Sequence, residues 1–408
     1  MESFISTLVS LLLVLGFGSC SSEKSLLPSD PLPPSGEEEH PVEKDPLAPG
    51  AMYDWETLRD GEMLPSDMVL IYGGGRNRNN PAVWRKEHFA DYLSYVDEQG
   101  KEHWLFDGFL FLEIFDWDES KQQGCKFLNG MRYNNHPLRA ACKEDWARLI
   151  RYYFEHSSGI AALDAAACQT QSRLGDPTYK TRVVIGLPEP IRQYSENDTS
   201  TRYWGEVDGR RLDFGLKNDR LTACRWFIDR VREEFNKKNF RYVELAGFYW
   251  IPEKTIDTEE LIRPIGDYLS SLNYSFQWIP YFKAHGFEKW RDLGFDYAYL
   301  QPNYFFNEQV DSSRLDEACR MADQHGMGME IEFTDHVLHS YGKGIRLHEY
   351  MEAFKSSGIW SKCRMAYYQG SMSFPLLKKS LAPEDRKLYY EFCHFVGDHP
   401  LNRGNRAK

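Results

Sequence analysis

The sequence has few basic residues for its number of acidic ones. It holds 49 lysines and arginines against 61 aspartates and glutamates, so its formal net charge at pH 7 is −12. This balance argues against a nucleic-acid partner, because such partners are held largely by lysine and arginine contacts to phosphates. Cysteine is scarce as well, with eight in 408 residues and no regular spacing. The chain is therefore not a small scaffold held together by disulfides.

Several motifs that carry well-defined chemistry are missing. The sequence has no G-x-S-x-G nucleophile elbow and no G-x-x-x-x-G-K-[ST] phosphate-binding loop. Metal-dependent amidohydrolases need an H-x-H pair at the end of the first strand, and the segment Ile71–Gly74 has none. Asp335, His336 and His339 form only a weak cluster, which is more typical of a polar loop than of a metal site. We therefore expect neither a metal nor a cofactor.

Long hydrophobic runs are also lacking. The apolar run from Phe4 to Phe17 is shorter than the roughly 20 residues that a membrane-spanning helix needs. It ends in Gly18-Ser19-Cys20, and small residues before a cysteine resemble a bacterial lipobox. Residues 1–20 are thus predicted to be a signal peptide with Cys20 as the lipidated residue. An ordinary secretory signal or a short anchor is the alternative.

The segment that follows has the composition of a tether. Residues 21–50 contain seven of the 20 prolines and an acidic run at Glu37, Glu38 and Glu39. Such a composition predicts an extended linker, here residues 21–60, between the anchor and a folded domain at 61–400 with a short tail at 401–408. We expect the protein in the bacterial cell envelope, in contact with a membrane only through its lipid, or otherwise secreted.

The folded part alternates between strand-like and helix-like segments. Apolar residues recur at spacings of three and four between the strands, as in the series Leu221, Cys224, Ile228, Val231 and Phe235. The strands read as continuous apolar runs, which is typical of a parallel sheet buried on both faces. Eight such runs occur: Met68 to Tyr72, Trp104 to Phe115, Arg182 to Leu187, Tyr242 to Trp250, Ser275 to Tyr281, Tyr297 to Leu300, Gly328 to Phe333 and Cys363 to Tyr368.

Eight strands with intervening helices predict an α/β fold, a single (β/α)8 TIM barrel with long loops after strands 2 and 3. These loops are residues 118–141 and 189–218. Closure of the barrel requires the first strand to pair with the last. An open doubly wound sheet is the competing fold. It would need a phosphate turn after the first strand, and Gly73-Gly74-Gly75 lacks the G-x-G-x-x-G spacing.

Carboxylates stand at the strand ends where a barrel places its active site. Glu332 ends the seventh strand and Glu253 follows the fourth, a placement that resembles many retaining glycosidases. Two facing carboxylates are what glycoside hydrolysis requires. We expect Glu332 as nucleophile or base and Glu253 as acid, with supporting or substitute charges at Glu113, Glu244 and Glu330. Because the usual Asn-Glu pair is missing at the fourth strand, the identity of the acid stays open, and any single glutamate could instead be a salt-bridged mouth residue.

Aromatic and amide side chains gather at the same strand ends. Sugar faces stack on aromatic rings while hydroxyls bond to amides and carboxylates. A single aromatic residue more often belongs to the core, so the grouping is the more specific signal. The predicted substrate-binding residues are Tyr249, Trp250, Tyr281, Gln301, Asn303, Tyr304, Tyr368 and Gln369. Successive side chains of a strand alternate between its two faces. We therefore expect one face of the fourth strand to hold Glu244, Ala246, Phe248 and Trp250.

Five segments also carry a resemblance to a family. They are Asp107 to Glu113, Gly247 to Glu253, Trp278 to Tyr281, Leu300 to Tyr304 and Gly328 to Glu332. In these segments the chain resembles the uncharacterised bacterial family called domain of unknown function 4855, over about residues 65–400. The resemblance implies a barrel of glycosidase-like appearance, often on a secreted or surface lipoprotein. We predict a glycoside hydrolase that acts on an oligo- or polysaccharide at the cell surface or in the periplasm. The alternative is a non-catalytic glycan-binding surface lipoprotein.

Overall fold

The computed structural model describes residues 63–402 except for 77–82, 176–178, 193–201 and 371. The predicted signal peptide, Cys20 and the tether lie outside the described residues. No helix among the residues described is long and apolar enough to cross a membrane. Within the same part of the chain, the cysteines from Cys125 to Cys393 form no disulfide.

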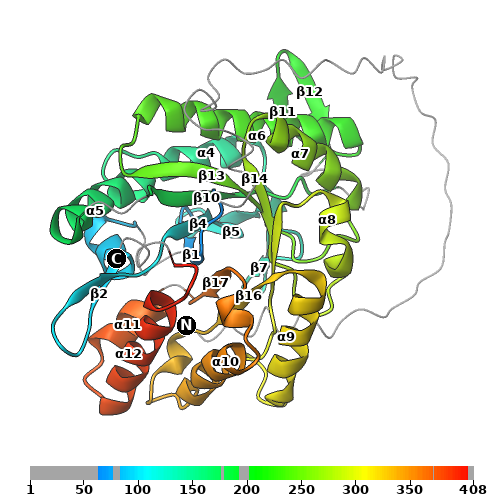
Figure 1. The fold of residues 1–408 in the computed structure, drawn as a ribbon. Helices are drawn as coiled ribbons and strands as arrows, with labels where there is room; N and C mark the ends of the chain where they lie inside the picture. Colours follow the sequence, from blue (N-terminus) through cyan, green and yellow to red (C-terminus); the bar gives the residue numbers. More distant parts are fainter. Residues whose placement is uncertain (1–62, 77–82, 176–178, 193–201, 371, 403–408) are drawn as a thin grey trace.

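Eight parallel strands close into a barrel (Figure 1). In chain order they are β1 (Asp67–Tyr72), β4 (Gly108–Leu112), β10 (Thr181–Leu187), β13 (Val243–Trp250), β14 (Ser275–Trp278), β15 (Tyr297–Leu300), β16 (Gly328–Glu332) and β17 (Met365–Tyr368). The first strand pairs with the last, with Met68 opposite Ala366, and on its other side with β4, where Met68 lies opposite Gly108. The predicted TIM barrel is therefore confirmed, and the open sheet is excluded because neither β1 nor β17 is an edge.

Helices surround the barrel and bury its outer face. They are α3 (Lys86–Leu93), α4 (Lys143–Tyr153), α5 (Gly159–Leu174), α6 (Lys217–Lys238), α7 (Glu259–Ser271), α8 (Trp290–Leu293), α9 (Ser313–His325), α10 (Gly344–Ser356), α11 (Ser373–Lys379) and α12 (Pro383–Gly397). The predicted α6 stripe is buried at Leu221, Cys224, Ile228 and Val231. The interior of the barrel is filled by a separate group of side chains, among them Leu110, Val184 and Ala366.

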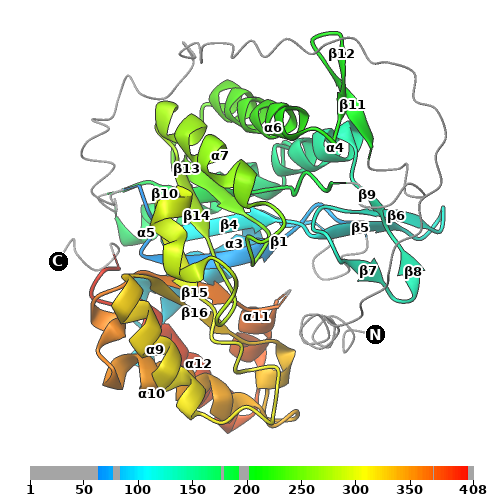
Figure 2. The ribbon, with the colours of Figure 1, turned by 90° about the vertical axis from the view of Figure 1, so that its right-hand side faces the viewer.

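Both predicted long loops contain secondary structure. The loop after β4 forms β5 (Phe115–Asp118), β6 (Gln123–Lys126), β7 (Arg132–Tyr133), β8 (His136–Pro137) and β9 (Arg139–Ala140). The loop after β10 forms the hairpin of β11 (Tyr203–Val207) and β12 (Arg210–Asp213). A further hairpin, β2 (Ser94–Val96) with β3 (Glu102–Trp104), precedes β4. Figure 2 shows the two long insertions on the same side of the barrel.

A bulge in β13 changes which of its side chains face inward. Val183 pairs with Leu245, but Val184 pairs with Gly247, so Ala246 is an extra residue in the strand. A side chain at position 247 would clash, because its Cβ would lie 2.1 Å from Oγ of Ser275. The extra residue breaks the alternation expected of a strand.

The bulge overturns the expected placement of Trp250. Ala246 and Tyr249 lie with the interior side chains, whereas Phe248 and Trp250 pack in the outer core between strands and helices. The Trp250 ring lies 6.1 Å from that of Phe276. The expectation that Glu244, Ala246, Phe248 and Trp250 share one face is therefore wrong.

The end of the barrel opposite the pocket is closed by buried polar contacts. Asp67 at the start of β1 accepts hydrogen bonds from the Tyr367 hydroxyl at 2.7 Å and from Nδ2 of Asn402 at 3.1 Å. His399 pairs with the same carboxylate at 2.9 Å. Although burial opposes the charge on His399, the Asp67 carboxylate raises its pKa. These contacts tie the end of the described chain to the first strand.

Candidate active site

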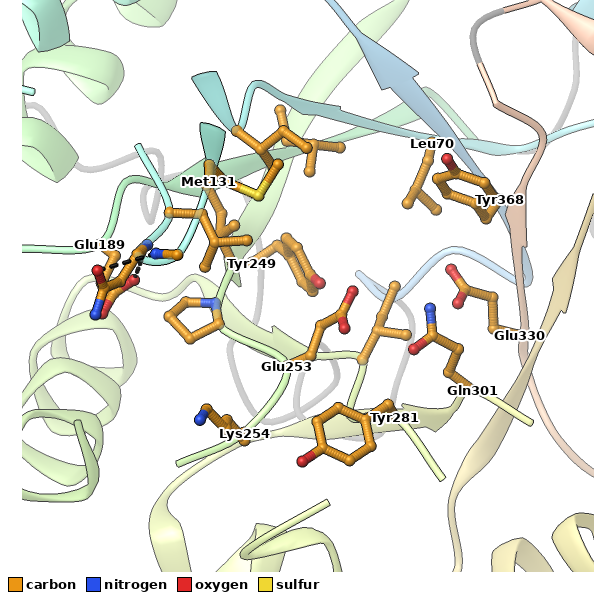
Figure 3. A pocket seen from close by; sticks show the side chains of 18 of the residues that line it. Leu70, Met131, Glu189, Tyr249, Glu253, Lys254, Tyr281, Gln301, Glu330 and Tyr368 are labelled. Carbon is orange, nitrogen blue, oxygen red and sulfur yellow. Dashed lines mark hydrogen bonds between the residues drawn. The ribbon is translucent and has the colours of Figure 1, made fainter. Parts of the chain in front are cut away.

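A pocket of about 240 Å³ opens at the carboxyl ends of the barrel strands. Figure 3 shows that the two sides of the pocket differ in polarity: apolar side chains such as Leu70 and Met131 lie opposite Glu253, Gln301 and Glu330. Its lining residues come from the strands and from the loops after them, including the insertion after β4. Such a mixture of apolar walls and a few convergent polar groups is typical of a small-molecule site.

Two carboxyl groups face this pocket from different strands. Glu253 lies in the loop after β13, the fourth barrel strand, and is partly exposed. Glu330 projects from β16, the seventh, and is only 1% exposed. The Gln301 side chain, from the end of β15, lies between them (Figure 3). The pocket thus holds an acid on a wall and a second acid deep at its floor.

Burial raises the pKa of both groups, and neighbouring carboxylates raise that of Glu330 further. Burial raises the pKa of Glu253 to about 7, although the hydrogen bond with Gln301 acts in the opposite direction. The pKa of Glu330 lies well above its ordinary value because the group is buried and because Glu332 and Glu253 are negatively charged. Burial therefore favours the protonated form of Glu253, and burial together with the neighbouring negative charges favours the protonated form of Glu330.

Glu332 lies beside the pocket but does not line it. It points inward from β16 as expected for a residue two positions from Glu330, and it is fully buried. Its Oε2 accepts a hydrogen bond from the Asn303 backbone N–H and another from the Tyr350 hydroxyl, both at 2.7 Å. Burial raises its pKa to about 7 even though these donors lower it. Glu332 therefore holds the loop after β15, and with it Asn303, in the pocket wall.

The structure separates the other two predicted carboxylates from the pocket. Glu113 accepts hydrogen bonds from the backbone N–H groups of Gly75 and Ile114, each at 3.0 Å, and so anchors the turn after β1. Glu244 is the second residue of β13 and forms a salt bridge with Arg182 at the amino-terminal end of the strands. It lies at the end of the barrel away from the mouth, so its predicted place at the site is wrong.

The predicted sugar-binding residues divide in the same way. Tyr249, Tyr281, Gln301, Asn303 and Tyr368 line the pocket.

Trp250, Tyr304 and Gln369 do not line it. The Tyr304 hydroxyl donates to Glu349 at 2.5 Å, and Gln369 accepts from the Tyr92 hydroxyl at 3.2 Å. These polar atoms are hydrogen-bonded to residues of the surrounding helices. The Tyr304 and Gln369 side chains therefore stabilise the barrel and do not line the pocket.

Comparisons with known proteins address the family and not the chemistry. The sequence profile of the domain of unknown function DUF4855 matches residues 67–394. The chain belongs to the DUF4855 family. This confirms the resemblance carried by the five sequence segments. A comparison with curated proteins finds no match.

Three of the solved structures that match this DUF4855 chain resemble it only weakly. One is a putative α-L-fucosidase from Bacteroides thetaiotaomicron, with 14% identity and a TM-score of 0.34, over 58% of this chain and 72% of that chain. Another is a mutant tryptophan synthase α-subunit from Pyrococcus furiosus, with 8% identity and a TM-score of 0.32, over 81% and 98%. A third is Rhizobium etli pyruvate carboxylase, with 8% identity and a TM-score of 0.34, over 86% and 29%. These scores transfer no activity to this DUF4855 protein.

The site of the DUF4855 chain also contains residues that the sequence did not single out. Glu189, after β10, is 7% exposed and accepts a hydrogen bond from the Asn129 backbone N–H at 2.6 Å. Lys254 and Asp257 line the pocket and lie 3.8 Å apart. The position of Glu189 directly after a barrel strand was the one sequence signal that could have found it. Among the residues described, no group of three or more His, Cys, Asp and Glu side chains could hold a metal ion.

Proposed function

We propose that this protein is a glycoside hydrolase in which Glu253 and Glu330 are the catalytic pair. The observation that carries the proposal is that two carboxyl groups from the fourth and seventh strands face one pocket, where burial raises the pKa of both. Glycoside hydrolysis needs one carboxyl group that is protonated and one that is ionised. Because burial raises the pKa of both groups, the pocket can supply a protonated carboxyl group at a pH where an ordinary glutamate is ionised.

The two carboxyl groups take different roles because they differ in depth. Glu253 is the acid, since it is partly exposed on the wall, where a leaving group can depart, and a pKa of about 7 keeps it protonated up to neutral pH. Glu330 lies at the floor and is the carboxylate that attacks the anomeric carbon or activates water. The positive charge that develops on the sugar in the transition state favours its ionised form.

This assignment replaces Glu332 by Glu330 as the second catalytic residue. Glu332 is a positioning residue, because it does not line the pocket and its carboxylate accepts hydrogen bonds from Asn303 and Tyr350. Replacing Tyr350 by Phe tests this role. The variant loses one donor to Glu332 and should raise KM, through a less fixed Asn303, more than it lowers kcat.

The rings in the pocket fit a carbohydrate. Tyr249 and Tyr281 lie on either side of Glu253, and Tyr368 lies on the side of Glu330 (Figure 3). The apolar side formed by Leu70 and Met131 can cover the C–H face of a sugar ring, while Gln301 and the carboxyl groups bind its hydroxyls. We propose an oligo- or polysaccharide substrate, and a lipid on Cys20 that keeps the enzyme at the cell envelope.

A screen of the purified protein against aryl glycosides and polysaccharides tests the proposal. Glu330→Gln should lower turnover by several orders of magnitude and change the affinity for neutral glycans little. Glu253→Gln should lose far more rate on natural glycosides than on aryl glycosides with acidic phenols, because good leaving groups need no acid. Glu206→Gln, which changes an exposed carboxyl group on β11 outside the pocket, is the matched control and should retain activity.

Two outcomes would contradict the proposal. If both catalytic variants hydrolyse every substrate at the wild-type rate, Glu253 and Glu330 are not the catalytic pair. If the wild type binds a glycan and hydrolyses none of the panel, the glycan-binding lipoprotein is the better description.

A further inference from the structure

The charges that line the pocket are almost all of one sign. Four acidic residues line it: Glu189, Glu253, Asp257 and Glu330. Among the described lining residues, Lys254 is the one base, and its ammonium lies 3.8 Å from the carboxylate of Asp257. An anionic sugar, such as a uronate or a sulfated residue, would therefore find no free cation here and would meet several carboxylates.

Two oxygen atoms of the pocket have no hydrogen-bond partner among the described residues. They are Oε1 of Gln301 and Oε2 of Glu330, and the two residues are 5% and 1% exposed. Both side chains line the pocket and lie side by side in Figure 3. Buried acceptors without a donor are costly, so the natural ligand should supply hydrogen-bond donors at this point.

Tyrosine rings stand close to these acceptors. Tyr249 and Tyr281 lie near Glu253, and Tyr368 lies on the opposite side, near Glu330 (Figure 3). The faces of such rings attract cations. A hydroxyl group could donate one hydrogen bond here, but an ammonium group donates three, accepts none and carries the charge that offsets the carboxylates.

We infer that the substrate is an amino sugar whose free ammonium group binds between Gln301 and Glu330. This inference rests on the proposed glycosidase function and adds the class of sugar. It predicts that acetylation of the amine abolishes the preference, because an acetamide has no charge and a single N–H donor. Glycans that contain partly deacetylated hexosamine units are the corresponding polymers.

Calorimetry on the full-length protein tests the inference. The probes are the methyl glycosides of glucosamine and galactosamine, each compared with its hydroxyl and N-acetyl counterpart at pH 7. At least one amine should bind about tenfold or more tightly than its hydroxyl counterpart, which corresponds to about 1.4 kcal/mol. Amines that bind no more tightly than their hydroxyl counterparts in both series would overturn the inference.

Variants locate the effect. Glu330→Gln should reduce the preference to within about threefold, and Glu206→Gln should leave it intact because Glu206 is exposed on β11 and does not line the pocket. Gln301→Met removes the other acceptor without changing a charge and should weaken amine binding if Glu330→Gln fails to fold. A preference unchanged in Gln301→Met and in folded Glu330→Gln would also overturn the inference.

Hydrolysis separates this inference from the proposed function. If the enzyme hydrolyses neutral glycosides and shows no amine preference, the inference fails and the glycosidase function stands. If an amino sugar binds selectively while no glycoside of any class is hydrolysed, the ammonium site is supported and the proposed catalysis fails.

Discussion

Replacing Glu189 by Gln should stabilise the protein above neutral pH. Burial raises the pKa of Glu189 from its ordinary value of 4.5 to about 7. Because the folded pKa lies above the unfolded one, the stability that this group contributes is fully present below about pH 4.5 and is lost as the pH rises through about 7. At about 1.36 kcal/mol per pH unit, the full loss is about 3 kcal/mol.

The amide has no ionised form and so avoids this loss. Its carbonyl oxygen can still accept the hydrogen bond that the Asn129 N–H donates to Glu189 at 2.6 Å. The variant should exceed the wild type in unfolding free energy by about 1 kcal/mol at pH 5 and by about 3 kcal/mol at pH 8.5. Urea unfolding followed by tryptophan fluorescence at the two pH values measures the difference.

An exposed glutamate provides the control. Glu206 lies on the surface of β11, and Glu206→Gln should change stability by less than about 0.5 kcal/mol at either pH. The reasoning is refuted if the advantage of Glu189→Gln does not grow with pH, or if that variant is less stable than the wild type at pH 8.5.

Three further predictions address catalysis, the end of the barrel opposite the pocket and the lipid anchor. If Glu253 is the acid, kcat/KM should fall about tenfold per pH unit above its pKa of about 7, and a flat profile from pH 6 to 9 would exclude it. His399→Ala should cost about 3 kcal/mol in urea unfolding at pH 6, because it leaves the buried carboxylate of Asp67 without its ion-pair partner; a cost below about 1 kcal/mol would contradict this. Cys20→Ala should move the protein from the membrane fraction to the soluble fraction or leave it as precursor, and equal fractionation of the two forms would disprove lipidation.

The sequence alone was enough to predict the barrel. Strands of a parallel sheet are buried on both faces and so read as short apolar runs, and the eight runs match the eight strands of the structure. The long loops, the pairing of β1 with β17 and the membership of the DUF4855 family followed from the same information. Local pattern sufficed because each strand and helix carries its own burial signal.

The sequence also predicted many of the residues that line the pocket, but it did not resolve their individual positions. Glu253 and Glu330 line the predicted mouth together with five of the eight predicted sugar-binding residues. A residue at the carboxyl end of a barrel strand has few places to lie other than the mouth, so its position along the strand is informative.

The tertiary structure alone decided which side chains reach the pocket. The extra residue at Ala246 turns Tyr249 inward and Trp250 outward, and a bulge leaves no clear trace in the sequence. Glu330 and Glu332 share a face of β16, yet only Glu330 lines the pocket. The Glu332 carboxylate instead accepts hydrogen bonds from the Tyr350 hydroxyl of α10 and from the Asn303 backbone N–H. Those two donors lie 18 and 29 residues away along the chain, and only the closed barrel brings them to the same carboxylate.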